Sequence, residues 1–226
     1  KYDHQGNKKK LNFKIDEFKK FKEKITYLVI ENFPGKLSNW ERENYQRNYL
    51  NEGLALANEN DYIIISDVDE IPNLTKVTDL NNYKFTVFEQ KMFYYKINLH
   101  NKTEPFWHGS RICKKKYLKS PQWLRDQNIK NYPFWRFDKI KWNIIKNGGW
   151  HFSFLMNPDQ IKSKIKSFAH AEYNNEYYTN LEKIERSIEN KIDLFNRPIS
   201  YKKDNIDEMF PKYIIDNKEK FKEWII

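Results

Sequence analysis

One twelve-residue stretch, DYIIISDVDEIP, constrains the fold of this chain more than any other part of the sequence. Residues 62–66 form a short apolar run rich in β-branched side chains, which predicts a strand covered on both faces. Asp67, Asp69 and Glu70 follow at once, and Pro72 is expected to end strand pairing. The stretch therefore predicts a strand that ends in three carboxylates, at the edge where open α/β sheets bind ligands.

The spacing of the two aspartates suits a divalent metal ion. Asp67 and Asp69 are one residue apart at a turn, so both side chains can reach a hard cation that prefers oxygen ligands and takes others from phosphates. An acidic turn that only caps a strand is the alternative interpretation of an isolated D-x-D. The apolar strand before it and the third carboxylate favour the metal site.

Length and composition narrow the class of protein. With 226 residues, the chain is expected to form a single domain over residues 1–226. The net charge of +10 favours anionic partners, but the lysines are scattered and form no dense patch, so no specific nucleic-acid partner is expected. The single Cys113 excludes an internal disulfide and fits a reducing, cytoplasmic compartment. No run approaches the length of a membrane span, and no signal peptide is visible.

The part of the chain before the acidic stretch predicts a strand and a long helix. Residues 26–30 (TYLVI) have the composition of a strand. Ser38 and Glu41 form a capping box that starts a helix running to about Asn58. We expect its buried face to include Leu50, together with Leu54 and Ala57 at helical spacing.

Arg47 lies on the backward extension of that buried face. Glu43 precedes it by four residues, a spacing at which the two side chains form an ion pair. The pair is therefore expected at a cleft rim, where Arg47 would meet a phosphate; a surface ion pair is the alternative.

Further elements follow the acidic stretch. Gly148 and Gly149 precede Trp150 and His151, and paired glycines here predict a close approach of the backbone to a ligand. The remaining pattern predicts strands over 85–88, 92–98, 107–113 and 141–145, and helices beginning at Ser120-Pro121 and Asn157-Pro158 and covering 181–192.

Three chemistries compete for the acidic strand end. A haloacid-dehalogenase-like phosphatase also has D-x-D after a strand, but it normally carries Thr or Val where this chain has Ile71. A basic nucleic-acid-binding module explains the charge and the aromatics, but not the carboxylates, which repel phosphate unless a metal intervenes. A nucleotide-sugar glycosyltransferase uses a metal held by D-x-D to neutralise the departing diphosphate.

Several longer motifs decide between these alternatives. They are WERE at 40–43 with QRN at 46–48, Gly53-Leu54, IIISDVDEIP at 63–72, WHG at 107–109, GGWHFS at 148–153, HAEY at 170–173, DLF at 193–195 with Arg197, and PKYI at 211–214. In this order the motifs cover nearly the whole chain, and they resemble glycosyltransferase family 17, the β-1,4-mannosyl-glycoprotein N-acetylglucosaminyltransferases.

The resemblance implies a GT-A fold, which is a Rossmann-like mixed sheet with helices on both sides. It also implies Mn²⁺ or Mg²⁺, a UDP-sugar donor such as UDP-GlcNAc, a glycan acceptor, and inversion at the anomeric carbon. The acceptor does not carry over, because the animal enzymes are anchored in the Golgi and no anchor is visible here. In the family, a first strand precedes the counterpart of residues 2–6 (YDHQG), so this chain is expected to lack that strand.

Site residues follow from the motifs. The metal is expected at Asp69 and Asp67, with His151 as a further ligand or a phosphate contact. Arg47, Arg125, Gly149 and Trp107 are expected at the donor. Trp107 or Trp150 would stack on a sugar ring, with core packing as the alternative for either tryptophan.

The catalytic base must be another carboxylate, because Asp67 and Asp69 are assigned to the metal. Glu172 ranks first, because the neighbouring His170 can tune its basicity. Asp126 ranks second and Glu70 third; a purely structural His170–Glu172 hydrogen bond is the alternative.

Overall fold

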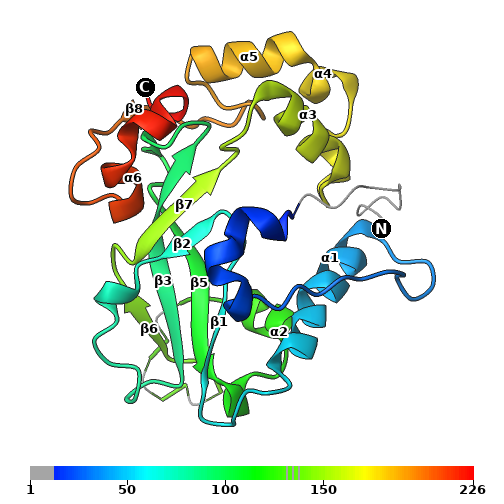
Figure 1. The fold of residues 1–226 in the computed structure, drawn as a ribbon, viewed down its shortest axis with the longest axis vertical. Coiled ribbons are helices and arrows are strands. Elements are labelled where there is room, and N and C mark those ends of the chain that lie inside the picture. Colours follow the sequence, from blue (N-terminus) through cyan, green and yellow to red (C-terminus); the bar gives the residue numbers. More distant parts are fainter. Residues whose placement is uncertain (1–12, 131, 134, 137) are drawn as a thin grey trace.

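The computed structural model describes residues 13–130, 132–133, 135–136 and 138–226 (Figure 1). The prediction about residues 2–6 lies outside this part of the chain. The described residues form eight strands of one mixed sheet: β1 (Tyr62–Ile65), β2 (Glu70–Pro72), β3 (Phe85–Tyr94), β4 (Leu99–Asn101), β5 (Phe106–Lys114), β6 (Trp142–Ile145), β7 (Gly149–Ser153) and β8 (Tyr201–Lys203).

Strand β3 is the centre of the sheet. It pairs antiparallel with β5 and β4, and parallel with β6 and β7. Beyond these, β1 pairs antiparallel with β5, β2 with β7 and β8 with β4. The α/β class is confirmed. A GT-A topology stays a prediction, because the described pairings are parallel only where β6 and β7 meet β3.

The helices begin where the sequence provides caps. Ser38 and Glu41 form the predicted capping box, Ser120 accepts from the Trp123 amide, and Asn157 caps its helix in the same way. The α-helices are α1 (Asn39–Asn48), α2 (Pro121–Asp126), α3 (Pro158–Ser167), α4 (Glu176–Thr179), α5 (Leu181–Glu189) and α6 (Lys212–Asp216). The principal 3₁₀ segments are η1 (Ile15–Lys24), η2 (Tyr49–Leu54) and η6 (Lys218–Trp224).

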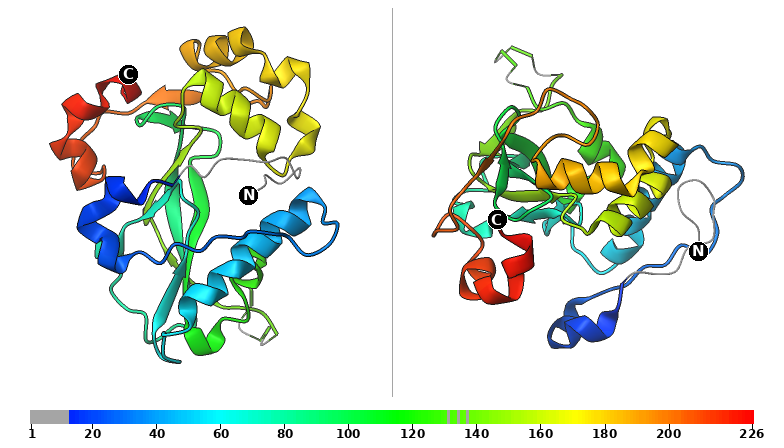
Figure 2. Two further views of the ribbon diagram at one scale, coloured as in Figure 1. Left: turned by 45° about the vertical axis from the view of Figure 1, so that its right-hand side comes forward. Right: turned by 90° about the horizontal axis from the view of Figure 1, so that it is seen from above.

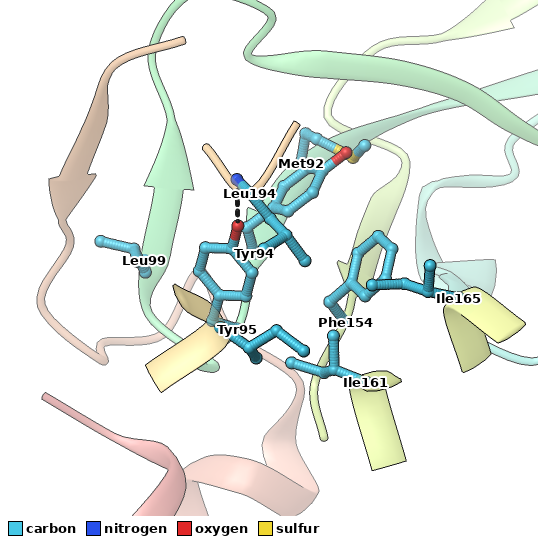
Figure 3. Close-up of a cluster of buried hydrophobic side chains, with 9 residues drawn as sticks. Met92, Tyr94, Tyr95, Leu99, Phe154, Ile161, Ile165 and Leu194 are labelled. Carbon is cyan, nitrogen blue, oxygen red and sulfur yellow. Dashed lines mark hydrogen bonds between the residues drawn. The ribbon is translucent and has the colours of Figure 1, made fainter. Parts of the chain in front are cut away.

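Helices cover both faces of β3 and β7. On one face, Ile161 and Ile165 of α3 pack with Phe154, Tyr94 and Leu194 (Figure 3), where Tyr95 accepts a hydrogen bond from the Leu194 amide. On the other face, α6 and η6 pack against the alternate side chains of the same strands. Figure 2 shows α1 and the group α3 to α5 on the same side of the sheet. That side carries the candidate site.

The other half of the sheet has its own two clusters. Ile63 and Ile65 of β1 pack with Cys113 and with Leu124 of α2, and burial raises the pKa of the Cys113 thiol to about 12. Phe88 lies in the cluster on the opposite face. None of the helices in the described ranges combines the length and the hydropathy that a membrane crossing requires.

One prediction about the acidic stretch is wrong. The strand is not covered on both faces, because Tyr62 and Ile64 are 38% and 39% exposed; β1 pairs only with β5 among the described strands. Strand pairing does end at Pro72, which is the last residue of β2 and itself pairs with Gly149. Proline is tolerated there because it lies at the end of a three-residue edge strand.

Three element boundaries also differ from the sequence prediction. Residues 26–30 form no strand in the structure, and residues 85–94 form one strand where two were expected. The helix after Ser38 ends at Asn48 and continues as 3₁₀ helix through Gly53, a poor helix former. Leu50 is consequently 44% exposed, whereas Leu54 packs beside Ile63 as predicted.

Candidate active site

The connection between β1 and β2 forms the centre of the site. Ser66 Oγ lies 2.7 Å from Ser110 Oγ, and the Phe152 amide donates to the Asp69 carbonyl at 2.9 Å. Val68, between the two aspartates, is fully exposed. The connection is therefore fixed at both ends by neighbouring strands, while its tip faces solvent.

Glu70 is a buried carboxylate that fixes this connection to neighbouring elements. Its side chain is only 1% exposed and accepts hydrogen bonds from Trp107 Nε1 at 2.8 Å and from both terminal nitrogens of Arg125 at 2.9 and 3.2 Å. A Cβ atom at Gly109 would lie 1.8 Å from Gln90 Oε1 and 2.9 Å from Glu70 Cδ. Glycine at position 109 therefore makes room for the buried carboxylate.

Asp67 holds two arginines from two different helices. Arg125 Nη2 donates to it at 2.8 Å, and Arg47 Nη2 lies 3.5 Å away. Arg47 also forms the predicted ion pair with Glu43, at 3.0 Å, and donates to Gln122. The structure thus brings both predicted arginines to the acidic loop, and the Asp67 carboxylate is turned towards them.

Asp69 has different surroundings. Its Oδ1 lies 3.4 Å from His151 Nε2, and its Oδ2 lies 3.6 Å from Lys164 Nζ of α3. Burial raises the pKa of Asp69, but the hydrogen bond to His151 and the charges of His151 and Lys164 outweigh it, so the pKa lies below its ordinary value. Asp69 is therefore ionised at neutral pH, and among the described residues neither His151 nor Lys164 forms an ion pair with another carboxylate.

His151 reaches this position because side chains alternate along β7. Trp150 and Phe152 point to the α6 face, so His151 points to the face of α3. Its ring lies 5.6 Å from that of Trp107, whose own ring is 42% exposed. His151 Nδ1 is buried and has no hydrogen-bond partner among the described residues.

That orphaned nitrogen bears on the predicted role of His151 as a metal ligand. A metal on Nε2 would move the ring proton to Nδ1, where a buried N–H would lack an acceptor, at a cost of about 1–3 kcal/mol. With the proton on Nε2, the ring donates towards Asp69 and Nδ1 needs no acceptor. The ring therefore fits a hydrogen-bond donor better than a metal ligand.

The fit of a metal ion depends on Asp69. Within the described ranges, no three His, Cys, Asp or Glu side chains converge as a metal site. Asp67 is occupied by Arg125 and Arg47, whereas Asp69 has no arginine partner among the described residues. One carboxylate suffices where Mg²⁺ or Mn²⁺ takes its other ligands from substrate phosphates and water. Asp69 fits such a shared site.

The first-ranked base lies at the rim of this region. Glu172 accepts from His170 Nδ1 at 2.8 Å, and its side chain is 60% exposed. The backbone and side-chain hydrogen bonds to Glu172 hold its pKa below the ordinary value. The His170 ring contacts Trp40 of α1 edge-on, with centroids 4.8 Å apart. The pair thus lies where α1 meets the segment after α3.

Two further predicted residues lie outside the carboxylate cluster. Asp126 accepts a hydrogen bond from Gln122, and Gln122 accepts one from Arg47. Asp126 is therefore connected to the carboxylate cluster only through Gln122 and Arg47. Gly149 has φ of +144°, and a Cβ there would lie 2.2 Å from the Ile71 carbonyl. The close backbone approach at Gly149 is therefore to strand β2, which also explains why glycine is needed there.

Sequence reasoning missed Lys164. Ile161 and Ile165 mark the buried face of α3, and Lys164 lies on the side of that face, because it follows Ile161 by three residues. A lysine on that side can lay its stem along the apolar surface with its amine at the edge, and this spacing was available in the sequence. Its meeting with Asp69 depends on tertiary packing and was not.

Comparison with known proteins identifies the family. Comparisons with curated proteins and with solved structures gave no match. The profile of glycosyltransferase family 17 matches residues 2–225, which is nearly the whole chain. This match favours a glycosyltransferase over the phosphatase and the nucleic-acid-binding module. The chain therefore belongs to glycosyltransferase family 17, a family of N-acetylglucosaminyltransferases, and is a glycosyltransferase.

Proposed function

We propose that this glycosyltransferase moves GlcNAc from UDP-GlcNAc to a glycan hydroxyl with inversion, on a GT-A-type fold that binds Mn²⁺ or Mg²⁺ at Asp69. Family membership implies a nucleotide-sugar donor and an acceptor. One observation supports the site: the ionised Asp69 carboxylate lies between His151 and Lys164, at the solvent-facing turn after β1. A bound divalent ion supplies electrostatic stabilisation of the departing diphosphate.

His151 and Trp107, whose rings lie side by side, each have a proposed task at the donor. His151 keeps its proton on Nε2 and donates it as a hydrogen bond, to Asp69 in the free enzyme and to a phosphate oxygen with donor bound. Trp107 offers the exposed part of its ring to a sugar, and its Nε1 bond to Glu70 fixes the ring orientation.

The two arginines have unequal tasks. Arg125 donates to Glu70, Asp67 and the Gly109 carbonyl, so its role is to hold the loop in place. Arg47 lies at the rim with a looser 3.5 Å contact to Asp67, and it is the arginine we assign to the nucleotide. Asp67 then orients both arginines. Asp67 would contact the metal only if the two arginines no longer paired with its carboxylate.

The transfer is proposed as a single displacement. The acceptor oxygen attacks the anomeric carbon, the bond from that carbon to the diphosphate oxygen breaks, and its electron pair leaves with UDP. A carboxylate takes the acceptor proton. Glu172 remains the first candidate because its oxygens are exposed, and Asp126 the second. Glu70 ranks last, since five donors surround its buried carboxylate.

A donor panel tests this function. UDP-GlcNAc, UDP-GalNAc, UDP-Glc and GDP-Man are screened for nucleotide release and for thermal stabilisation of the protein, each with Mn²⁺ and with EDTA. We expect UDP-GlcNAc to give the fastest release and EDTA to abolish it. Equal release in EDTA would contradict the metal at Asp69, and preference for a guanosine donor would contradict the assigned substrate.

A further inference from the structure

Lys164 is the charged group beside Asp69 to which the family resemblance assigns no role. It lies in the last turn of α3, and its side chain is 30% exposed. The amine is 3.6 Å from Asp69 Oδ2 and 4.8 Å from the centre of the Phe154 ring. Phe154 is itself buried, so the amine lies over a fixed ring at the same time as it faces the acidic loop.

We propose that Lys164 occupies the cation position at Asp69 in the free enzyme and moves to the donor diphosphate when the metal and nucleotide bind. The inference rests on the proposed metal site at Asp69. Asp69 Oδ2 faces the lysine, and Oδ1 faces His151. A divalent ion held by Asp69 would share this carboxylate with the ammonium group of Lys164, and the two like charges would repel each other.

When the donor diphosphate is bound, Lys164 is attracted to the ligands instead of being repelled by the metal ion. The diphosphate brings at least two negative charges next to the ion, and a lysine with three N–H donors is a common phosphate contact. The ammonium group, which would repel the ion alone, would then donate hydrogen bonds to the diphosphate that accompanies the ion. Lys164 thereby links the two ligands: it weakens the binding of metal without nucleotide and strengthens the binding of nucleotide with metal.

This role also supports the transfer step. When the bond from the anomeric carbon to the diphosphate breaks, the electron pair stays on the diphosphate oxygen. Lys164 stabilises that charge by a hydrogen bond and gives up no proton, so the step needs no further reactant.

The test uses Lys164→Met, which keeps an unbranched apolar side chain at this position and removes the charge. The matched control is Lys166→Met, because Lys166 lies in the same helical turn with its side chain in solvent. Manganese binding without nucleotide is measured from the loss of the free Mn²⁺ signal in electron paramagnetic resonance. UDP binding at saturating Mn²⁺ is measured by calorimetry on the full chain.

The two affinities should move in opposite directions. Lys164→Met should bind Mn²⁺ alone about three- to tenfold more tightly and UDP with Mn²⁺ about tenfold or more weakly. Lys166→Met should change neither, and Lys164→Arg, which keeps the charge, should retain UDP affinity within about threefold. A merely structural lysine would lower both affinities or neither.

Two results would overturn the inference by different routes. If the parent shows Mn²⁺-dependent UDP binding and Lys164→Met leaves it unchanged, or also weakens Mn²⁺ binding, Lys164 does not have this role while the metal site stands. If the parent itself shows no Mn²⁺-dependent UDP binding, the metal site and the inference fall together. Lys164→Gln is measured in the same way if the methionine variant does not fold.

Discussion

Two aspartates in the described part of the chain lie beside basic side chains but differ in accessibility: Asp193 and Asp69. Around Asp193, whose side chain is 1% exposed, Arg197 donates at 2.7 Å, and the Phe195 amide and Tyr201 hydroxyl donate as well. All of these donors come from the same short segment of chain. Around Asp69, by contrast, the basic side chains come from β7 and α3, and the carboxylate is 25% exposed.

This difference is the reason for treating Asp193 as part of a structural brace and for proposing that Asp69 binds a ligand. Both oxygens of Asp193 accept hydrogen bonds from Arg197. Glu70 is also closed by donors, although it lies next to Asp69 in sequence. Asp69 is partly exposed, and among the described residues its neighbours His151 and Lys164 pair with no other carboxylate. An accessible carboxylate beside such groups is the better candidate for a binding site than a carboxylate closed by arginine.

The largest expected effect concerns an exposed carboxylate rather than a closed one. Glu172→Gln should lower kcat by about 100- to 10,000-fold if Glu172 takes the acceptor proton. UDP-GlcNAc affinity and thermal stability should stay at the parental values, because the side chain is exposed. Turnover and donor affinity are measured in parallel. Turnover close to that of the parent would transfer the role of base to Asp126.

The second effect tests Glu70 as a closed carboxylate. Glu70→Ala leaves the Arg125 charge, 8% exposed, without its principal partner and leaves the Trp107 N–H unpaired. Breaking a buried pair in this way costs about 3–5 kcal/mol of the free energy of unfolding, measured by urea denaturation. Glu172→Ala, at an exposed pair, should leave that free energy unchanged. An unaltered free energy in Glu70→Ala would remove the distinction between closed and open carboxylates.

These effects also show what the sequence can and cannot predict. The capping box at Ser38 and Glu41 and the proline-started helix after Ser120 were predictable, because helix caps depend on neighbours in sequence. The strand over 85–94 was divided in the prediction because residues 89–91 are polar. In the fold Gln90 is buried and donates to Ser110, a partner that only tertiary structure supplies.

The same distinction between local and tertiary contacts applies to the candidate site. The clustering of Asp67, Asp69 and Glu70 could be predicted, since the three lie within four residues. Which of them is buried and which is open could not, because burial depends on distant partners: Trp107 for Glu70, and Lys164 for Asp69. Residues 26–30 illustrate the opposite error, because their strand-forming composition finds no partner strand in the described fold.

The third effect is the pH dependence of the brace. Burial raises the pKa of Asp193, but hydrogen bonds and charge from Arg197 outweigh it and hold the pKa below its ordinary value. The pair therefore stabilises the fold fully above the unfolded pKa of about 4 and loses this contribution as the pH falls through the lower folded value.

Asp193→Asn should accordingly cost about 2 kcal/mol of the free energy of unfolding at neutral pH. The difference between parent and variant should shrink as the pH falls below about 4. Denaturation at a series of pH values measures both. A difference that stays constant down to pH 2 would show that the Asp193–Arg197 pair contributes no pH-dependent stability.

The central claim is that Asp69 is the open carboxylate through which a divalent ion and the UDP diphosphate bind together. Calorimetry of UDP with and without Mn²⁺, on the parent and on Asp69→Asn, tests it most directly. The account predicts that Mn²⁺ tightens UDP binding to the parent by about tenfold or more, that Asp69→Asn abolishes this gain, and that both proteins unfold at the same temperature. An equal Mn²⁺-dependent gain in Asp69→Asn would contradict the account.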